Sequence, residues 1–93
     1  MLKPPAPLEA PLAAIWAEVL KQERVARDAN FFALGGHSLS AIRMLGRVAK
    51  QFGVRLSLRT LFEAPTVAEL AEILDLELKL AAVAAVSNPG DAP

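Results

Sequence analysis

The sequence predicts an all-α protein: a small bundle of four helices, three long and one short. The 93-residue chain is rich in apolar residues (54%) but poor in aromatic ones (5%), which suits helices better than a β-sandwich. Apolar residues recur at three- and four-residue spacing in three separate segments. Proline-rich stretches at residues 1–7 and 87–93 bracket these segments and resemble linkers. A chain of this length forms at most one domain.

The first long helix is expected over about 9–22. Its apolar stripe has amphipathic spacing and comprises Leu12, Ile15, Trp16, Val19 and Leu20. Pro11 is tolerated because it falls in the first turn. Residues 23–37 form a long connection, and a loose loop of that length is unusual. We therefore expect four of its apolar side chains to be pinned to the core: Val25, Phe31, Phe32 and Leu34.

The second long helix is expected over about 38–51. Its predicted core face holds Ala41, Ile42, Leu45, Val48, Ala49 and Phe52, and its opposite face holds Arg43, Arg47 and Lys50. Ser38 is well placed as the N-cap, a role worth about 1 kcal/mol. Gly53 stands where a left-handed residue ends a helix.

A short helix is expected at 58–63, stopped before Pro65. The third long helix then opens with Thr66 and Glu69, which have the spacing of a capping box. Its buried stripe is predicted to be Val67, Leu70, Ala71, Leu74 and Leu78. We expect this helix to reach about residue 80 and to fray through 86.

Charge and cysteine content exclude several classes of function. Ten basic and ten acidic residues give zero formal net charge, so no global field attracts nucleic acid or an anionic membrane. The chain has no cysteine, hence no disulfide, thiolate metal site or cysteine nucleophile. Its start has too many prolines for a signal sequence, and its longest apolar run is too short to span a bilayer. We expect a cytoplasmic, monomeric domain without a metal.

The stretch "NFFALGGHSLSAIRML" at 30–45 carries the functional signal. It is not a hydrolase elbow, because Ser40 replaces the second glycine of G-x-S-x-G. The only histidine, His37, is adjacent to Ser38 in the chain, whereas a triad histidine approaches from elsewhere in the fold. Ser38 is then either a helix cap or an attachment point. The start of a helix stabilises an anion such as phosphate, and Gly35 and Gly36 leave the hydroxyl accessible.

Two apolar residues near Ser38 are predicted to lie at the surface. Leu39 falls among the basic residues on the face turned away from the core, and Met44 lies at the flank of the same helix. Exposed apolar side chains can contact a partner protein without contributing to the core. A methionine side chain is flexible and can pack against several different partners. We expect Leu39, Met44, Arg43 and Arg47 to form a docking surface.

The segment "DANFFALGGHSLSAIRML" resembles the phosphopantetheine-attachment motif of carrier proteins, specifically the peptidyl carrier (thiolation) domains of non-ribosomal peptide synthetases. The matching residues are Asp28, Asn30, Phe31, Phe32, Leu34, Gly35, Gly36, His37, Ser38 and Leu39. The segments 15–20 and 61–74 extend the resemblance, which covers roughly 8–80. Two residues depart from the pattern. Ala33 replaces a common acidic residue, and Ser40 replaces a common aliphatic one, which is expected to weaken the apolar face and alter partner preference.

The resemblance implies a linker at 1–7, a carrier domain at 8–80, and a helix extension with a linker at 81–93. It implies that a phosphopantetheinyl transferase moves 4′-phosphopantetheine from coenzyme A onto Ser38. The thiol of this arm then holds amino-acyl or peptidyl groups for adenylation, condensation and thioesterase domains. The carrier catalyses none of these steps. His37 is expected to have a structural or partner-contact role.

Other interpretations stay open. An acyl carrier, or an aryl carrier, has a similar fold, although acyl carriers typically have an acidic recognition helix and this chain has no acidic residue between 38 and 62. A helical interaction module that is never modified explains everything except the residues around Ser38. A three-helix DNA-binding domain could use Arg43, Arg47 and Lys50, but zero net charge and Leu39 within that face oppose it.

Overall fold

The structure, a computed structural model, describes residues 8–87, with side chains described as far as residue 84. Four helices follow one another: α1 (Glu9–Leu20), α2 (Ser38–Phe52), α3 (Leu58–Glu63) and α4 (Val67–Ser87). Within the described residues the only β pairing is a single bridge between Asn30 and Thr66, so the predicted all-α class is confirmed. The predicted linker at 1–7 lies outside the described residues, as does the one predicted at 87–93 except for Ser87, which is the last residue of α4.

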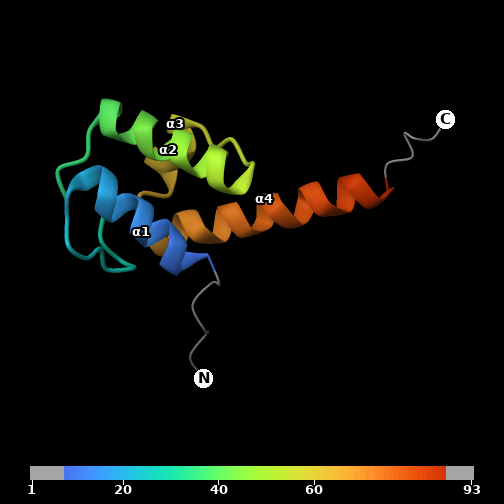
Figure 1. Ribbon diagram of the computed structural model, residues 1–93, viewed down its shortest axis with the longest axis horizontal. Helices are drawn as coiled ribbons and strands as arrows, with labels where there is room; N and C mark the ends of the chain where they lie inside the picture. The colour runs from blue at the N-terminus through green and yellow to red at the C-terminus, as the bar shows by residue number, and fades with distance from the viewer. Residues whose placement is uncertain (1–7, 88–93) are drawn as a thin grey trace, which may run out of the picture.

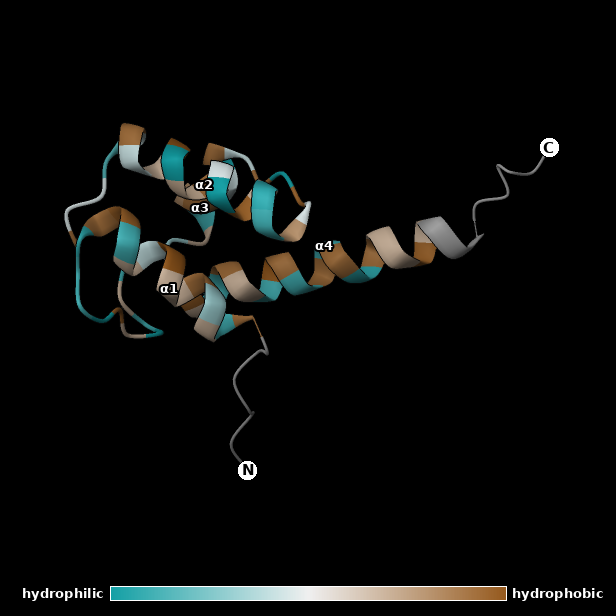
Figure 2. Cartoon of the chain, viewed as in Figure 1, coloured by the Kyte–Doolittle hydropathy of each residue, from teal (hydrophilic) through white to brown (hydrophobic). Residues whose placement is uncertain are grey.

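Helix α1 packs against both α2 and α4, and the short α3 packs against α2 (Figure 1). The core lies between these helices and is apolar throughout. Its largest fully buried side chains are Trp16, Phe31, Leu12, Met44, Leu61, Leu70, Leu74, Val48 and Val67. The last turns of α4 extend beyond the other three helices, and apolar residues recur along this extension (Figure 2).

The helix ends agree closely with the sequence pattern. Helix α1 stops at Leu20, because Lys21 adopts a left-handed conformation (φ 57°) and ends the helix slightly before the predicted residue 22. Gly53 ends α2 with φ 73°, as expected. Helix α3 has the predicted bounds. Helix α4 continues to Ser87, past the expected end near residue 80.

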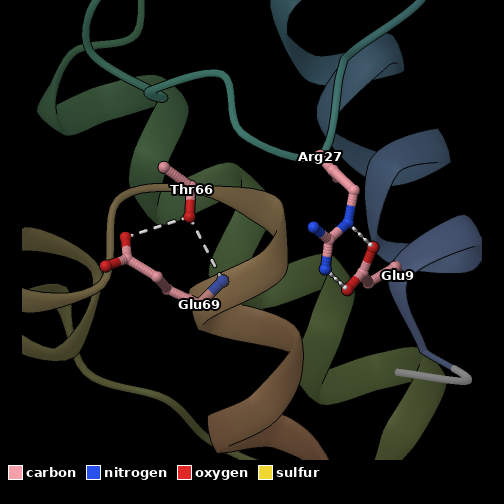
Figure 3. Close-up of polar contacts among 4 residues, drawn as sticks. All are labelled: Glu9, Arg27, Thr66 and Glu69. Carbon is pink, nitrogen blue, oxygen red and sulfur yellow. Dashed lines mark hydrogen bonds and ion pairs between the residues drawn. The ribbon is translucent and has the colours of Figure 1, made fainter. Parts of the chain in front are cut away.

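Polar contacts fix the start of α4 and tie the long loop to α1 (Figure 3). Half of the predicted capping box is present: Thr66 Oγ1 accepts from Glu69 N at 3.2 Å, whereas the Glu69 carboxylate accepts from the Thr66 hydroxyl at 2.9 Å instead of from the Thr66 backbone N–H. The Arg27 guanidinium donates two 2.8 Å hydrogen bonds to the buried Glu9 carboxylate. These bonds raise the pKa of Arg27 above its ordinary value. The Arg27 carbonyl also accepts from Ala68 N, so one loop residue contacts both α1 and α4.

The long loop is pinned to the core mainly through Phe31, as predicted. Its ring is completely buried and meets Trp16 edge-on, with 5.0 Å between ring centroids. Its backbone N–H donates to the Pro65 carbonyl at 2.7 Å, which holds the loop against the start of α4. Val25 and Phe32 pack against the core while half-buried. Leu34 is also half-buried but lies outside the core cluster, so its predicted core position is wrong.

Two residues of α2 are exchanged relative to the prediction. Met44 is fully buried, so the prediction of an exposed Met44 is wrong, whereas Ile42, predicted for the core, is 58% exposed. The core stripe follows i, i+3, i+4 and i+7 spacing through Ala41, Met44, Leu45 and Val48. The predicted face was rotated by part of a turn from this stripe. The spacing of apolar residues along the helix does not by itself determine whether Met44 or Ile42 lies in the core.

No helix within residues 8–87 combines the length and apolar character needed to cross a membrane.

Candidate functional site

Ser38 is the first residue of α2, and its side chain is exposed at the open end of that helix. Its hydroxyl makes no hydrogen bond within the described part of the chain. Backbone N–H groups in the first turn of a helix lack intrahelical partners and carry partial positive charge. The position therefore combines an accessible hydroxyl with a backbone that stabilises an attached anion.

The N-cap of α2 is His37, so the prediction that Ser38 caps this helix is wrong. His37 has an extended backbone, and its Nδ1 accepts from Ser40 N at 3.5 Å. In return, Ser40 Oγ accepts from His37 N at 2.8 Å and donates to the His37 carbonyl at 2.9 Å. This reciprocal capping box leaves the Ser38 hydroxyl out of the capping hydrogen bonds. His37 therefore has a structural role, which is one of the two kinds of role expected of it.

Ser40 points inward, with only 8% of its surface exposed. The prediction that it weakens the exposed apolar face is therefore wrong. Its small polar side chain is explained by the capping box, because a leucine at this position could not bond the His37 backbone. The departure of the sequence from the family pattern at Ser40 thus has a local structural reason.

The glycine pair before the site is required by the packing of the loop. A Cβ on Gly36 would lie 2.4 Å from two atoms of the Phe31 ring and 2.6 Å from the Phe31 carbonyl oxygen. The Gly36 N–H donates to that same carbonyl at 3.0 Å, so the two backbones must approach closely. Gly35 has φ +97°, a conformation that favours glycine. Both glycines therefore have a conformational reason that requires no partner.

Exposed apolar side chains lie close to Ser38 in the chain. Leu39 is 59% exposed, as predicted, and Ile42, one turn further along α2, is 58% exposed. On α3, Phe62 is also exposed and stacks on Phe32, with 5.1 Å between ring centroids. Ile42 was missed because its hydrophobicity and spacing fit a core position as well as a surface one.

A shallow cleft of about 340 Å³ lies between the end of α1 and the start of α2. It is lined by Val19, Leu20, Lys21, Gly35, His37, Leu39, Ser40 and Arg43. Arg43 thus lines the same cleft as Leu39, whereas Arg47 forms an ion pair with Glu18 of α1. Of the four predicted docking residues, Leu39, Arg43 and Arg47 lie on the surface and Met44 does not.

Comparison with known proteins identifies the class of this site. Residues 10–74 match the family model for the phosphopantetheine attachment site. The chain is 58% identical over 69 residues to malpinin synthetase of Mortierella alpina. It is 49% identical over 73 residues to the dimodular nonribosomal peptide synthase of Bacillus subtilis (strain 168). These matches cover 74% and 78% of this chain but only 1% and 3% of the two synthetases.

Solved structures agree with this assignment. A peptidyl carrier protein in complex with the phosphopantetheine transferase Sfp and coenzyme A is 34% identical, with a TM-score of 0.75, and the match covers 82% of this chain and 99% of that one. A prototype of the peptidyl carrier domains of modular peptide synthetases is 36% identical, with a TM-score of 0.69 over 81% and 99% of the two chains.

The chain belongs to the phosphopantetheine-attachment family. Within that family it is a peptidyl carrier domain of the kind found in non-ribosomal peptide synthetases. The group attached to such domains is phosphopantetheine. The exposed, unbonded Ser38 hydroxyl at a helix start fits a phosphate-linked group.

We predict that Ser40→Ala and Ser38→Ala differ in stability. Ser40→Ala removes the reciprocal hydrogen bonds to His37 and should lower the free energy of unfolding by about 1 kcal/mol. Ser38→Ala removes an exposed hydroxyl and should change it by less than about 0.5 kcal/mol. Urea denaturation followed by circular dichroism measures both. A larger loss of stability in Ser38→Ala than in Ser40→Ala would indicate that Ser38 caps the helix.

Proposed function

We propose that Ser38 carries the 4′-phosphopantetheine arm of this peptidyl carrier, and that the arm's thiol holds amino-acyl or peptidyl groups as thioesters. One observation carries the assignment of the residue. The Ser38 hydroxyl is exposed and makes no hydrogen bond to residues 8–87, because His37 and Ser40 cap the helix. The domain that performs this role spans about 8–80, and α4 continues beyond it.

In arm attachment the chain supplies the Ser38 hydroxyl as the nucleophile. In the transfer, Ser38 Oγ forms a bond to the phosphorus of the pantetheine phosphate of coenzyme A. The bond from that phosphorus to the adenosine-bearing phosphate breaks, 3′-phosphoadenosine 5′-phosphate leaves, and a base of the transferase takes the hydroxyl proton. The start of α2 stabilises the phosphodiester anion that results. The missing cysteine is consistent with a thiol that comes from the attached group.

The carrier acts as a substrate for its partners and catalyses no step itself. Similar carriers have been solved with a phosphopantetheine transferase and joined to an adenylation domain that holds phenylalanyl-adenylate. For this chain we propose the same two kinds of partner, followed by condensation and thioesterase domains. The domain works in the cytoplasm, where coenzyme A and aminoacyl adenylates are made.

The docking surface for these partners comprises Leu39, Ile42, Arg43 and Arg47. Leu39 and Ile42 supply apolar area along α2 close to Ser38, and both are more than half exposed. Arg43 supplies positive charge between α1 and α2, and Arg47 lies in the same region in its ion pair with Glu18. Arginine with apolar neighbours is typical of protein interfaces. Met44 is excluded from this surface because it is buried.

Intact-mass measurement tests the assignment of Ser38. The purified chain is incubated with coenzyme A, Mg²⁺ and a broad-specificity phosphopantetheinyl transferase, beside Ser38→Ala and Ser40→Ala. We expect the wild type and Ser40→Ala to gain the mass of one phosphopantetheine, and Ser38→Ala to gain none. A gain in Ser38→Ala would place the arm elsewhere. No gain in a folded wild-type chain would make this an unmodified interaction module.

Leu39→Ala and Met44→Ala separate docking from packing. Leu39→Ala should change the free energy of unfolding by less than about 0.5 kcal/mol, since the side chain is exposed, and should slow arm transfer. Met44→Ala should cost about 2–5 kcal/mol, because it empties a buried site. Thermal denaturation and the initial rate of mass gain measure the two effects. An unchanged transfer rate in Leu39→Ala would remove Leu39 from the docking surface.

A further inference from the structure

The cleft described above lies between the end of α1 and the start of α2, which meet at one end of the bundle (Figure 1). Its lining includes His37 and Leu39, the residues on either side of Ser38 in the chain. Its volume of about 340 Å³ is within the range of small-molecule sites, roughly 300–1,000 Å³. A group bonded to Ser38 therefore begins next to a concave surface of suitable size.

The cleft combines positive charge with an apolar wall. Lys21 and Arg43 are exposed and form no ion pair within the described part of the chain, although the whole chain has zero formal net charge. None of the described residues that line the cleft is acidic. The apolar wall consists of Val19, Leu20 and Leu39. Since lysine and arginine bind phosphate through charge-assisted hydrogen bonds, the lining matches an anionic ligand with an apolar segment.

The α3 side of α2 is less suited to an anion. There Phe62 is 55% exposed and stacks on Phe32, so this side offers mainly apolar area. The one basic residue of α3, Arg59, forms an ion pair with Glu63 of the same helix. The cleft beside α1 is therefore the better match for an anionic group attached at the start of α2.

We propose that the phosphopantetheine arm lies in this cleft when no partner is bound, held by Lys21 and Arg43 at its oxygens and by the apolar wall at its methyl groups. The inference rests on the proposed attachment to Ser38. The arm matches the lining, because it has an anionic phosphodiester, a branched apolar segment and two amides. Attachment also selects this occupant, since a tethered group has a high effective concentration near its anchor. Because Leu39 and Arg43 also belong to the proposed docking surface, a partner that covers them releases the arm.

Isotope-filtered nuclear Overhauser effects (NOEs) test this placement. The full chain is labelled with ¹³C and ¹⁵N, modified with unlabelled coenzyme A, and shown by intact mass to carry one arm. We expect NOEs from the methyl groups of the arm to Val19 and Leu20 on α1, and none to Phe62 on α3. These α1 NOEs should weaken at high salt concentration, because salt screens exposed charges.

Charge-reversal variants show whether the two cations hold the arm. In the modified chain, Lys21→Glu and Arg43→Glu should each weaken the α1 NOEs by about twofold or more. Arg55→Glu is the matched control and should keep them, since Arg55 follows α2 and does not line this cleft. All three side chains are exposed, so the fold should persist. Lys21 lies outside the proposed docking surface, so Lys21→Glu remains a substrate even if Arg43→Glu slows arm transfer.

The outcomes separate this inference from the assignment of Ser38. A modified wild-type chain whose arm contacts Phe62, or contacts no side chain of α1, would overturn the inference and leave the assignment standing. NOEs to α1 that keep their full intensity in both Lys21→Glu and Arg43→Glu would also overturn it, because the cations would then not hold the arm. A folded wild-type chain that gains no mass would overturn the assignment and the inference together.

Discussion

The site depends on one packing interaction, the burial of Phe31 against Trp16 with Gly36 folded over it. Phe31 lies in the middle of a long loop that contains no helix, and it is the loop's only fully buried side chain within the described residues. Its ring packs on α1, its N–H bonds to the Pro65 carbonyl just before α4, and its carbonyl accepts from Gly36. The segment leading to α2 is thereby held between two other helices. This fixes where α2 begins, and hence where Ser38 stands.

At the start of α2, the residues that cap the helix are different from Ser38, the proposed attachment residue. In many helices the serine at the start would satisfy the first N–H groups itself. Here the residues on either side of Ser38 do so through hydrogen bonds between His37 and Ser40. Asn30 performs a similar local role earlier in the loop, where its Oδ1 accepts from the N–H groups of Phe32 and Ala33. The loop is ordered by its own side chains, so the Ser38 hydroxyl remains available for chemistry.

Features set by local chemistry could be predicted from the sequence. Gly53 at the end of α2 and the Thr66 cap at the start of α4 are examples, because each depends on residues close together in the chain. The family could be recognised in the same way, since the motif around Ser38 is one continuous run of residues. Some features set by packing could not be predicted. Whether Met44 or Ile42 faces the core depends on the position of α1 and α3, and the need for Gly36 depends on the Phe31 ring. The capping role of His37 was missed because serine is the commoner N-cap.

A comparison of two glycine substitutions tests most directly whether the Phe31–Gly36 contact places the site. Gly36→Ala sets a Cβ against Phe31 and should lower the free energy of unfolding by about 1–3 kcal/mol and slow modification of Ser38. Gly46→Ala is the control. Gly46 is an exposed residue in the middle of α2, and a Cβ added there meets nothing within 4 Å. The substitution should therefore raise the free energy of unfolding by about 0.5–1 kcal/mol. A Gly36→Ala chain as stable and as readily modified as the wild type would contradict this account.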